Sequence, residues 1–186
     1  MSIEVSSRSE FNALATFVWR ANRVYRVYAT DQDLFFIRIG GQDVDWAAAL
    51  DSLGFPGVWL GRKLNARRAA SLERKSAEAD QLSPQVLVYQ HPHSFRASIS
   101  DIRSASFEPG AQLSLYGPHA AVWRFTLEEG RSLRFQFENG GEATTALEVL
   151  RRVLGAEFEF SVVWDEAKER FRKPRPGEAV APAAAG

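Results

Sequence analysis

Residues 94–155 constrain the fold more than any other part of the chain, because short alternating strands lead directly into one capped helix. Apolar and polar side chains alternate along 122–128 and again along 132–138. A period of two is typical of antiparallel strands that bury one face. The short connection between the two segments contains Gly130, which suits a tight turn. The sequence therefore predicts a β-hairpin here.

The helix that follows this hairpin has clear signals at both ends. Asn139 has the side chain of an N-cap, and Glu142 stands three residues later as its capping-box partner. Arg151 and Arg152 complement the negative end of the helix dipole, and Gly155 suits the position after the last turn. Apolar residues lie between these signals at helical spacing: Ala143, Ala146, Leu147, Leu150, Val153 and Leu154.

Composition and charge argue against several classes of function. The 186 residues are enough for one hydrophobic core, and 23 basic residues balance 23 acidic ones. A dedicated nucleic-acid-binding domain usually carries an excess of positive charge, so we expect no nucleic-acid partner. The chain has no cysteine, and hence neither disulfides nor thiolate metal ligands. No apolar run is typical of a signal peptide or a membrane span, which predicts a cytoplasmic protein.

Local spacing predicts the remaining elements. Residues 41–93 are expected to form a helical insertion between the second and third strands. Residues 158–164 predict one more edge strand after the C-terminal helix. From Lys173 the chain is rich in Pro, Ala and Gly, so we expect a single domain over 1–172 and a disordered tail over 173–186. The expected strands, besides the hairpin above, are 23–29, 34–39, 95–99, 102–107 and 113–116, and the expected helices are 8–20, 46–53, 58–81 and 84–89.

The loop of the first hairpin decides which side chains share a face. A three-residue loop over 31–33 pairs Thr30 with Leu34 and places Arg26 opposite Arg38 on the outer face. A two-residue loop would instead place Arg26 among apolar side chains. Because a slip of one residue exchanges the two faces of a strand, we expect the three-residue loop.

These elements predict an α+β fold, mainly β with helices: a seven-stranded antiparallel barrel or sandwich capped by a C-terminal helix. This order of elements resembles the pleckstrin-homology-like superfold over residues 22–40 and 94–155. Residues 95–102 resemble a segment of bacterial members in which a Ser-x-Ile motif connects two strands. The resemblance implies a module that binds phosphoinositides, peptides or other protein segments. The loop that carries basic residues in phosphoinositide-binding members is acidic here, at Asp31 and Asp33, which argues against an inositol-phosphate site.

The motifs of the chain predict no catalysis, no cofactor and no metal. His91 and His93 are a close pair of imidazoles, but a zinc site needs further ligands, and neither cysteine nor clustered carboxylates lie nearby in sequence. The sequence contains no phosphate-binding loop, dinucleotide-binding fingerprint or nucleophile elbow. An enzyme of unrecognised type, with a site assembled from distant residues, stays open as the weakest alternative.

The predicted helix over 58–81 carries the most suggestive functional feature. Six basic residues and one acidic residue, Glu73, lie between Arg62 and Lys75. A Trp-containing start followed by basic residues is typical of a helix that lies on an anionic membrane surface or docks on a protein. An ordinary helix with a solvated charged face also explains the pattern and is the commoner case. The candidate contact residues are Trp59, Arg62, Lys63, Arg67 and Arg68.

Arg26 and Arg38 form a second candidate site, for an anion. Like charges that face each other across two strands are unfavourable, so an anion or an acidic side chain would relieve them. Alternatively, the two long side chains splay into water. The outer faces of this hairpin would also carry Tyr28, Leu34 and Phe36, which is too apolar for bare solvent. Unless a helix covers them, these side chains predict self-association as a homodimer.

The sequence as a whole predicts a non-enzymatic interaction module that binds a protein partner or an anionic membrane surface. A module of the second kind would be cytoplasmic and peripheral to the inner face of the membrane. The first alternative is a small-ligand or lipid-binding pocket between the barrel and the inserted helices, and the second is the enzyme of unrecognised type.

Overall fold

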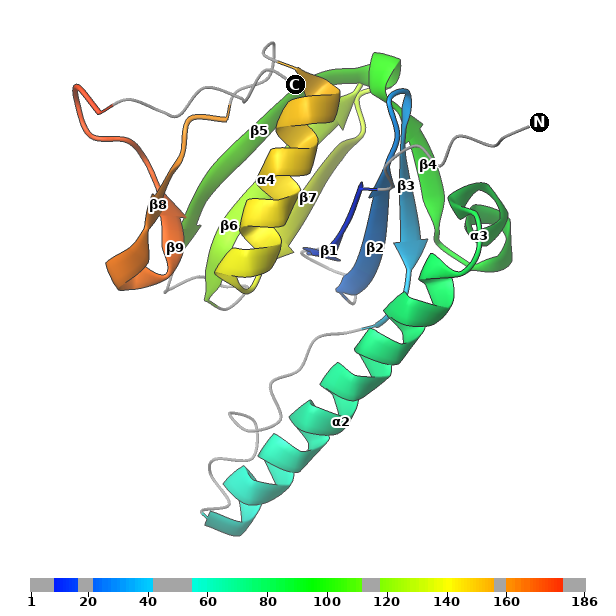
Figure 1. The fold of residues 1–186 in the computed structure, drawn as a ribbon, viewed down its shortest axis with the longest axis vertical. Coiled ribbons are helices and arrows are strands. Elements are labelled where there is room, and N and C mark those ends of the chain that lie inside the picture. The colour runs from blue at the N-terminus through cyan, green and yellow to red at the C-terminus, as the bar shows by residue number, and fades with distance from the viewer. Residues whose placement is uncertain (1–8, 17–21, 42–54, 112–117, 156–159, 179–186) are drawn as a thin grey trace.

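The computed structural model describes residues 9–16, 22–41, 55–111, 118–155 and 160–178, with backbone alone for 55–65 and 68. A seven-stranded antiparallel sheet with the order β4-β3-β2-β1-β7-β6-β5 forms its centre (Figure 1). β4 and β5 are the two edges, so the fold is mixed α+β and the sheet is open instead of closed into the predicted barrel. The strands are β1 Ser9–Ala15, β2 Arg23–Ala29, β3 Asp33–Arg38, β4 Phe95–Ser98, β5 Ile102–Ala111, β6 His119–Leu127 and β7 Ser132–Phe137.

The hairpin and helix that the sequence predicts form as β6, β7 and α4 (Gly140–Leu154). The Asn139 side chain accepts a hydrogen bond from Glu142 N at 2.9 Å, which confirms the N-cap. The Glu142 carboxylate accepts from Asn12 N at 2.8 Å and from Asn12 Nδ2 at 3.0 Å. The residue predicted as a capping-box partner therefore ties the start of α4 to β1.

A short ladder joins the two halves of the sheet. Two residue pairs, Leu14–Gln136 and Ala15–Phe135, connect β1 to β7, whereas seven pairs connect β1 to β2. Just past this ladder, Thr16 N donates to Arg134 O at 3.2 Å. The sheet thus consists of a β1–β4 half and a β5–β7 half with a narrow junction between them.

The larger core lies between the sheet and α4, and aromatic rings dominate it. Phe36 is fully buried, and its ring stacks on Phe95 at 4.4 Å, Phe135 at 5.2 Å and Trp123 at 6.0 Å between centroids. Each buried aromatic side chain removes roughly 150–250 Å² from water, so this face carries the main hydrophobic stabilisation. Small and branched side chains of α4 close the core: Ala143, Ala146, Leu147, Leu150 and Leu154.

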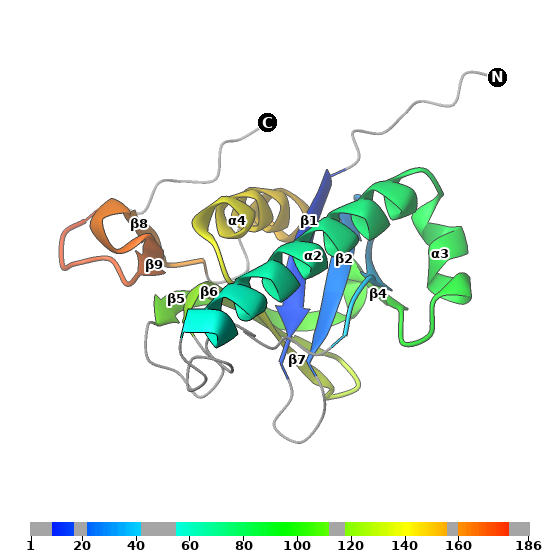
Figure 2. The same cartoon turned by 90° about the horizontal axis from the view of Figure 1, so that it is seen from below.

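The helices of the insertion cover the opposite face of β2 and β3. They are α2 (Phe55–Asp80) and α3 (Pro84–Gln90), as the sequence predicts for 58–81 and 84–89. The C-terminal turns of α2 meet the sheet and the rest of the helix extends past it, while α3 lies beyond β4 at the edge of the molecule (Figures 1 and 2). A second, smaller core forms on this face from Tyr28, Phe35, Ile37, Ala79 and Leu87.

The predicted helix over 8–20 is wrong, because residues 9–15 form β1. Phe11, Ala13 and Ala15 belong to the larger core with a period of two. A short apolar run fits helical and strand periods equally, and here pairing with β2 and β7 decides. As a consequence, the insertion lies between the third and fourth strands.

Other predicted elements differ in detail. β8 (Val163–Asp165) pairs with β9 (Arg170–Arg172) in a separate two-stranded sheet, so the predicted strand over 158–164 is not an edge of the main sheet. At the start of the predicted tail, Arg172 Nη1 contacts Glu178 Oε2 at 2.7 Å. This hydrogen bond, with one from Arg175 N, lowers the pKa of Glu178 to about 2. The predicted elements over 46–53 and 113–116, and the last eight residues of the tail, lie outside the described residues.

Candidate functional site

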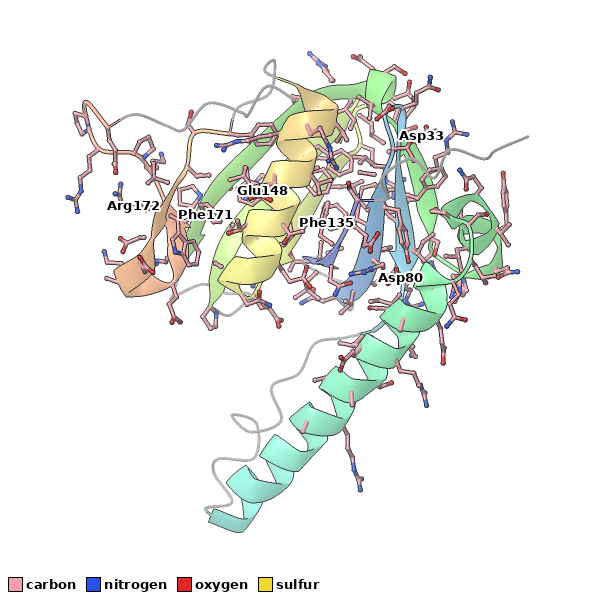
Figure 3. The ribbon with its side chains drawn as sticks, viewed as in Figure 1. Asp33, Asp80, Phe135, Glu148, Phe171 and Arg172 are labelled. Atoms are coloured by element: carbon pink, nitrogen blue, oxygen red, sulfur yellow. The ribbon has the colours of Figure 1, made fainter. Side chains whose placement is uncertain are left out.

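An ionic cluster attaches the C-terminal end of α2 to the sheet. Arg26 on β2 donates from Nε and Nη2 to the two Asp80 carboxylate oxygens at 3.2 and 2.9 Å. Glu10 on β1 adds an ion pair to Arg26 at 3.4 Å, and the Tyr28 hydroxyl donates to Asp80 at 2.6 Å. Figure 3 shows Asp80 at the end of α2 that meets these strands. A bidentate pair of this kind fixes both position and orientation, so it anchors the helix.

The charges of this cluster are mutually satisfied. Burial acts to lower the pKa of Arg26, but the hydrogen bond and charge of Asp80, with the charge of Glu10, outweigh it and the net shift is upward. Burial and the hydrogen bond to Asp80 both raise the pKa of Tyr28 above its ordinary value. Arg26 therefore stays charged and Tyr28 stays protonated, as a structural role requires.

The observed hairpin register corrects the predicted one. Ala29 pairs with Leu34 and Arg26 pairs with Ile37, which is the register of the two-residue loop. The prediction of a three-residue loop is wrong because it assumed that Arg26 could not lie among apolar side chains. Asp80 arrives from α2, distant in sequence, and supplies the carboxylate that makes the position favourable.

The same register separates the two arginines of the predicted anion site. Arg38 pairs with Tyr25 and Arg26 pairs with Ile37, so the two arginines are not cross-strand partners. Arg38 Nε donates to Gly40 O at 3.2 Å. Phe36 and Leu34, expected outside, lie in the larger core, and Tyr28 lies under α2 and α3. The structure therefore does not bring Arg26 and Arg38 together. The apolar side chains from which self-association was predicted, Tyr28, Leu34 and Phe36, are buried in the two cores.

The predicted basic contact residues all lie on α2. Trp59, Arg62 and Lys63 fall in the part of α2 whose backbone alone is described, as does Arg68, and Arg67 is exposed. In the rest of the helix, exposed Arg74 forms an ion pair with Glu78 at 3.6 Å, one turn apart. Acidic side chains thus accompany the basic ones toward the docked end of the helix.

An exposed apolar surface lies beside this docked end. Tyr89 and Val86 on α3 are 91% and 45% exposed, and Leu82, just before the helix, is 46% exposed. Val86 and Tyr89 are three residues apart and lie on one side of α3, whereas Leu82 precedes the helix and its N-cap, Ser83. We call these three residues the α3 surface. They are three of the four exposed large hydrophobic residues among those the structure describes.

The sequence carries a signal for this surface that periodicity did not reveal. Residues 81–95 contain no Asp, Glu, Lys or Arg, although a quarter of the chain is charged. Within α3, Pro84 and Leu87 are buried, and Leu87 packs with Phe35 and Ile37. A charge-free segment that presents apolar side chains outward is typical of an interaction surface.

A hollow of about 360 Å³ adjoins the α3 surface, between α2, α3 and β3. Its floor contains buried Ile39, Ala79 and Leu87. Exposed Lys75, Glu78 and His91 stand at its margin, with Leu82 and Arg38 completing the lining. We call it the α2–α3 hollow. Its volume is within the range of small-molecule sites, and its polar margin is mixed in charge.

Other polar residues of this region form hydrogen bonds and ion pairs within the sheet. Asp33 of the acidic hairpin loop pairs with Arg96 on β4 at 2.7 Å. Ser94 Oγ accepts from Arg38 N at 2.9 Å. In the part of the chain that the structure describes, His91 and His93 are not joined by a third residue into a group that could hold a metal. Among the described residues, no helix is long and apolar enough to cross a membrane.

Comparisons of this chain with protein-family models, with curated proteins and with solved structures find no match. The function is therefore inferred from the geometry of the described residues.

Proposed function

We propose that this protein is a non-enzymatic protein-interaction module whose contact surface is the α3 surface. The observation that carries the proposal is Tyr89, an aromatic side chain 91% exposed on a helix whose Leu87 is buried in the smaller core. Tyr is enriched among the residues that dominate binding energy in protein interfaces. Val86 and Leu82 extend the apolar area around it, and Leu87 holds the helix to the sheet.

A protein partner fits this surface better than an anionic membrane does. Binding to anionic lipid depends on clustered Lys and Arg, each of which contributes about 1 kcal/mol near the surface. The exposed turns of α2 beside the α3 surface carry Glu73 and Glu78 along with Arg74 and Lys75, so the local charges largely cancel. Apolar contact, without a strong positive field, favours recognition of a protein.

The fold proposal follows the resemblance seen in the sequence. We propose that the two halves of the sheet form a partly open barrel of the pleckstrin-homology-like kind. The strand order supports this, because β1 links β2 to β7 and α4 follows the last strand of the sheet. The short β1–β7 ladder is the place where such a barrel would open.

Site-specific photo-crosslinking in the native host tests the proposed contact surface. A benzoyl-phenylalanine at position 89 replaces an exposed aromatic residue, so the fold should tolerate it. The matched control carries the same group at Glu129, which is exposed in the β6–β7 turn. We expect a discrete adduct of higher mass at position 89 and none at position 129. The absence of an adduct at position 89, or equal adducts at both positions, would contradict the proposal.

The α2–α3 hollow supports a second candidate function, the binding of a small amphiphilic ligand. The apolar floor of Ile39, Ala79 and Leu87 suits an apolar chain. At the margin two cations, Arg38 and Lys75, outnumber Glu78, which suits a chain that ends in an anion. Titration with octanoate and with octylamine, followed by NMR, distinguishes this candidate. Shifts centred on the floor residues with octanoate alone, which Lys75→Gln weakens, would support it. Equal shifts with both probes, or none, would exclude it.

A further inference from the structure

We infer that α2 is a releasable lid on the face of β2 and β3, held in place by Asp80, and that Glu10 keeps Arg26 paired when the lid opens. This conformational device is independent of the α3 surface and of the proposed function. Its first support is the small contact that α2 makes with the sheet. Of the α2 side chains that the structure describes, only Ser76 and Ala79 are buried, and both are small. The earlier turns of the helix run away from the sheet (Figure 1).

The packing beneath α2 is incomplete. The Ser76 hydroxyl oxygen is buried and has no hydrogen-bond partner among the described residues. Such an atom gives up its hydrogen bonds to water without replacement, so it disfavours the docked position. Besides the α2–α3 hollow, a second hollow of about 180 Å³ adjoins the helix at Leu72, with Val24 and Ile39 also in its wall. Unfilled space forfeits contacts between atoms, so apolar packing holds α2 weakly.

The ionic contact at Asp80 supplies the directional hold that packing lacks. Three hydrogen bonds reach its carboxylate from the sheet, two from the Arg26 guanidinium and one from the Tyr28 hydroxyl. Hydrogen bonds to charged groups are strong, but they weaken steeply as distance and angle change. A small displacement of the end of α2 therefore breaks this contact as a unit.

Arg26 has a second set of partners that does not move with α2. Glu10 Oε1 lies 3.4 Å from Arg26 Nη2, and Asn12 Oδ1 accepts from Arg26 Nη1 at 3.4 Å. Both belong to β1, which pairs with β2 through seven residue pairs, so they stay beside Arg26 when the helix leaves. A buried cation without a partner would oppose release, and Glu10 supplies the counter-charge that prevents this. While α2 is docked, the two carboxylates repel each other across one guanidinium. Asp80 therefore favours the docked state, and Glu10 favours the released one.

Release of α2 changes what the sheet presents to solvent. The two hollows share Ile39, so displacement of the helix joins their walls into one apolar groove that runs from Val24 to Leu87. Leu87 itself stays packed on Phe35 and Ile37, because α3 is a separate helix that begins at Pro84. The lid thus opens a groove on the sheet while the rest of the fold stays intact.

A single introduced cysteine tests for release, because the chain has no cysteine of its own. Ser76→Cys is nearly isosteric and places a thiol under the lid. The matched reference is Val149→Cys on α4, since Ser76 and Val149 are 8% and 7% exposed. Buried thiols react only when the structure opens, so the rate of alkylation by iodoacetamide, a neutral reagent, measures the open population. We expect Ser76→Cys to react at least tenfold faster than Val149→Cys. Equal rates would overturn the inference, because α2 would then leave only on global unfolding.

The two carboxylates give opposite predictions in the Ser76→Cys background. Asp80→Asn should speed alkylation at least tenfold, because the docked state loses its hold. Glu10→Gln should slow it about threefold, because the released state loses its counter-charge. The control is Glu78→Gln, which removes an exposed carboxylate from the same turn and should change the rate less than twofold.

The result for Glu10→Gln separates the lid from simpler explanations. Removal of a nearby negative charge makes a thiolate easier to form, so a direct effect on the thiol would speed alkylation in both variants. A cluster that only stabilises the fold would also be weakened by either change. Faster alkylation in Glu10→Gln, or an acceleration in Glu78→Gln as large as that in Asp80→Asn, would overturn the inference.

Discussion

The two faces of the sheet are built in different ways. The face under α4 is filled by stacked aromatic rings around Phe36 and closed by a helix with a hydrogen-bonded N-cap. The face under α2 and α3 has a five-residue core, an ionic cluster at the end of α2 and a hollow of about 360 Å³ between its helices. It also carries the exposed side chain of Tyr89. From this comparison we propose that the face under α4 mainly supplies stability and that the side with the α3 surface supplies contacts.

The largest expected effect comes from neighbouring phenylalanines on opposite faces of β3. Phe36→Ala should lower the free energy of unfolding by about 4 kcal/mol, because it leaves a cavity among stacked rings. Phe35→Ala should cost about half as much, since the smaller core can close around the gap. Urea denaturation of both variants measures the difference. A larger loss for Phe35→Ala would contradict the division of roles.

The ionic cluster gives the next effect. Asp80→Ala leaves Arg26, a largely buried cation, without its bidentate partner, and should cost about 2 kcal/mol. The double variant Arg26→Met with Asp80→Ala should recover more than half of that loss, because it removes the largely buried cation along with its bidentate partner. Urea denaturation of the wild type, Arg26→Met, Asp80→Ala and the double variant completes the double-mutant cycle. Additive losses would show that the two residues do not act as a pair.

The cap of α4 gives a smaller effect on the stable face. Asn139→Ala removes the acceptor for Glu142 N and should cost about 1 kcal/mol, whereas Asn139→Asp should cost less because aspartate also caps well. Comparison of the two variants in the same denaturation assay separates the contribution of the capping hydrogen bond from that of side-chain packing. Equal losses would assign the effect to packing.

The smallest expected effect on stability comes from the α3 surface. Tyr89→Ser should change the free energy of unfolding of the monomer by less than about 0.5 kcal/mol, because the side chain is 91% exposed. Phe35→Ala is the destabilising reference on the same face. A loss as large as that of Phe35→Ala would mean that Tyr89 belongs to the core.

The stable face was largely predictable from sequence because its signals are local. Gly130 in the turn, Asn139 at the cap and the alternation along β6 and β7 each act within a few residues, and all agree. The helix bounds of α3 also follow from Pro84 at its first position.

Sequence-based prediction was wrong where distant residues decide the structure. The spacing of residues 9–15 fits a helix, and pairing with two strands, one of them more than a hundred residues away, makes it β1. The register of the first hairpin depends on Asp80, which reaches Arg26 from a helix outside the hairpin. The α3 surface was not predicted because its signal is an absence of charge in residues 81–95, whereas the charges of residues 62–75 form a conspicuous pattern.

Photo-crosslinking from position 89, with position 129 as the control, tests most directly the central claim that the α3 surface makes contacts. We predict a discrete adduct of higher mass from position 89 alone, because Tyr89 is 91% exposed. No adduct from position 89, or equal adducts from both positions, would contradict the account, because the α3 surface would then make no specific contact.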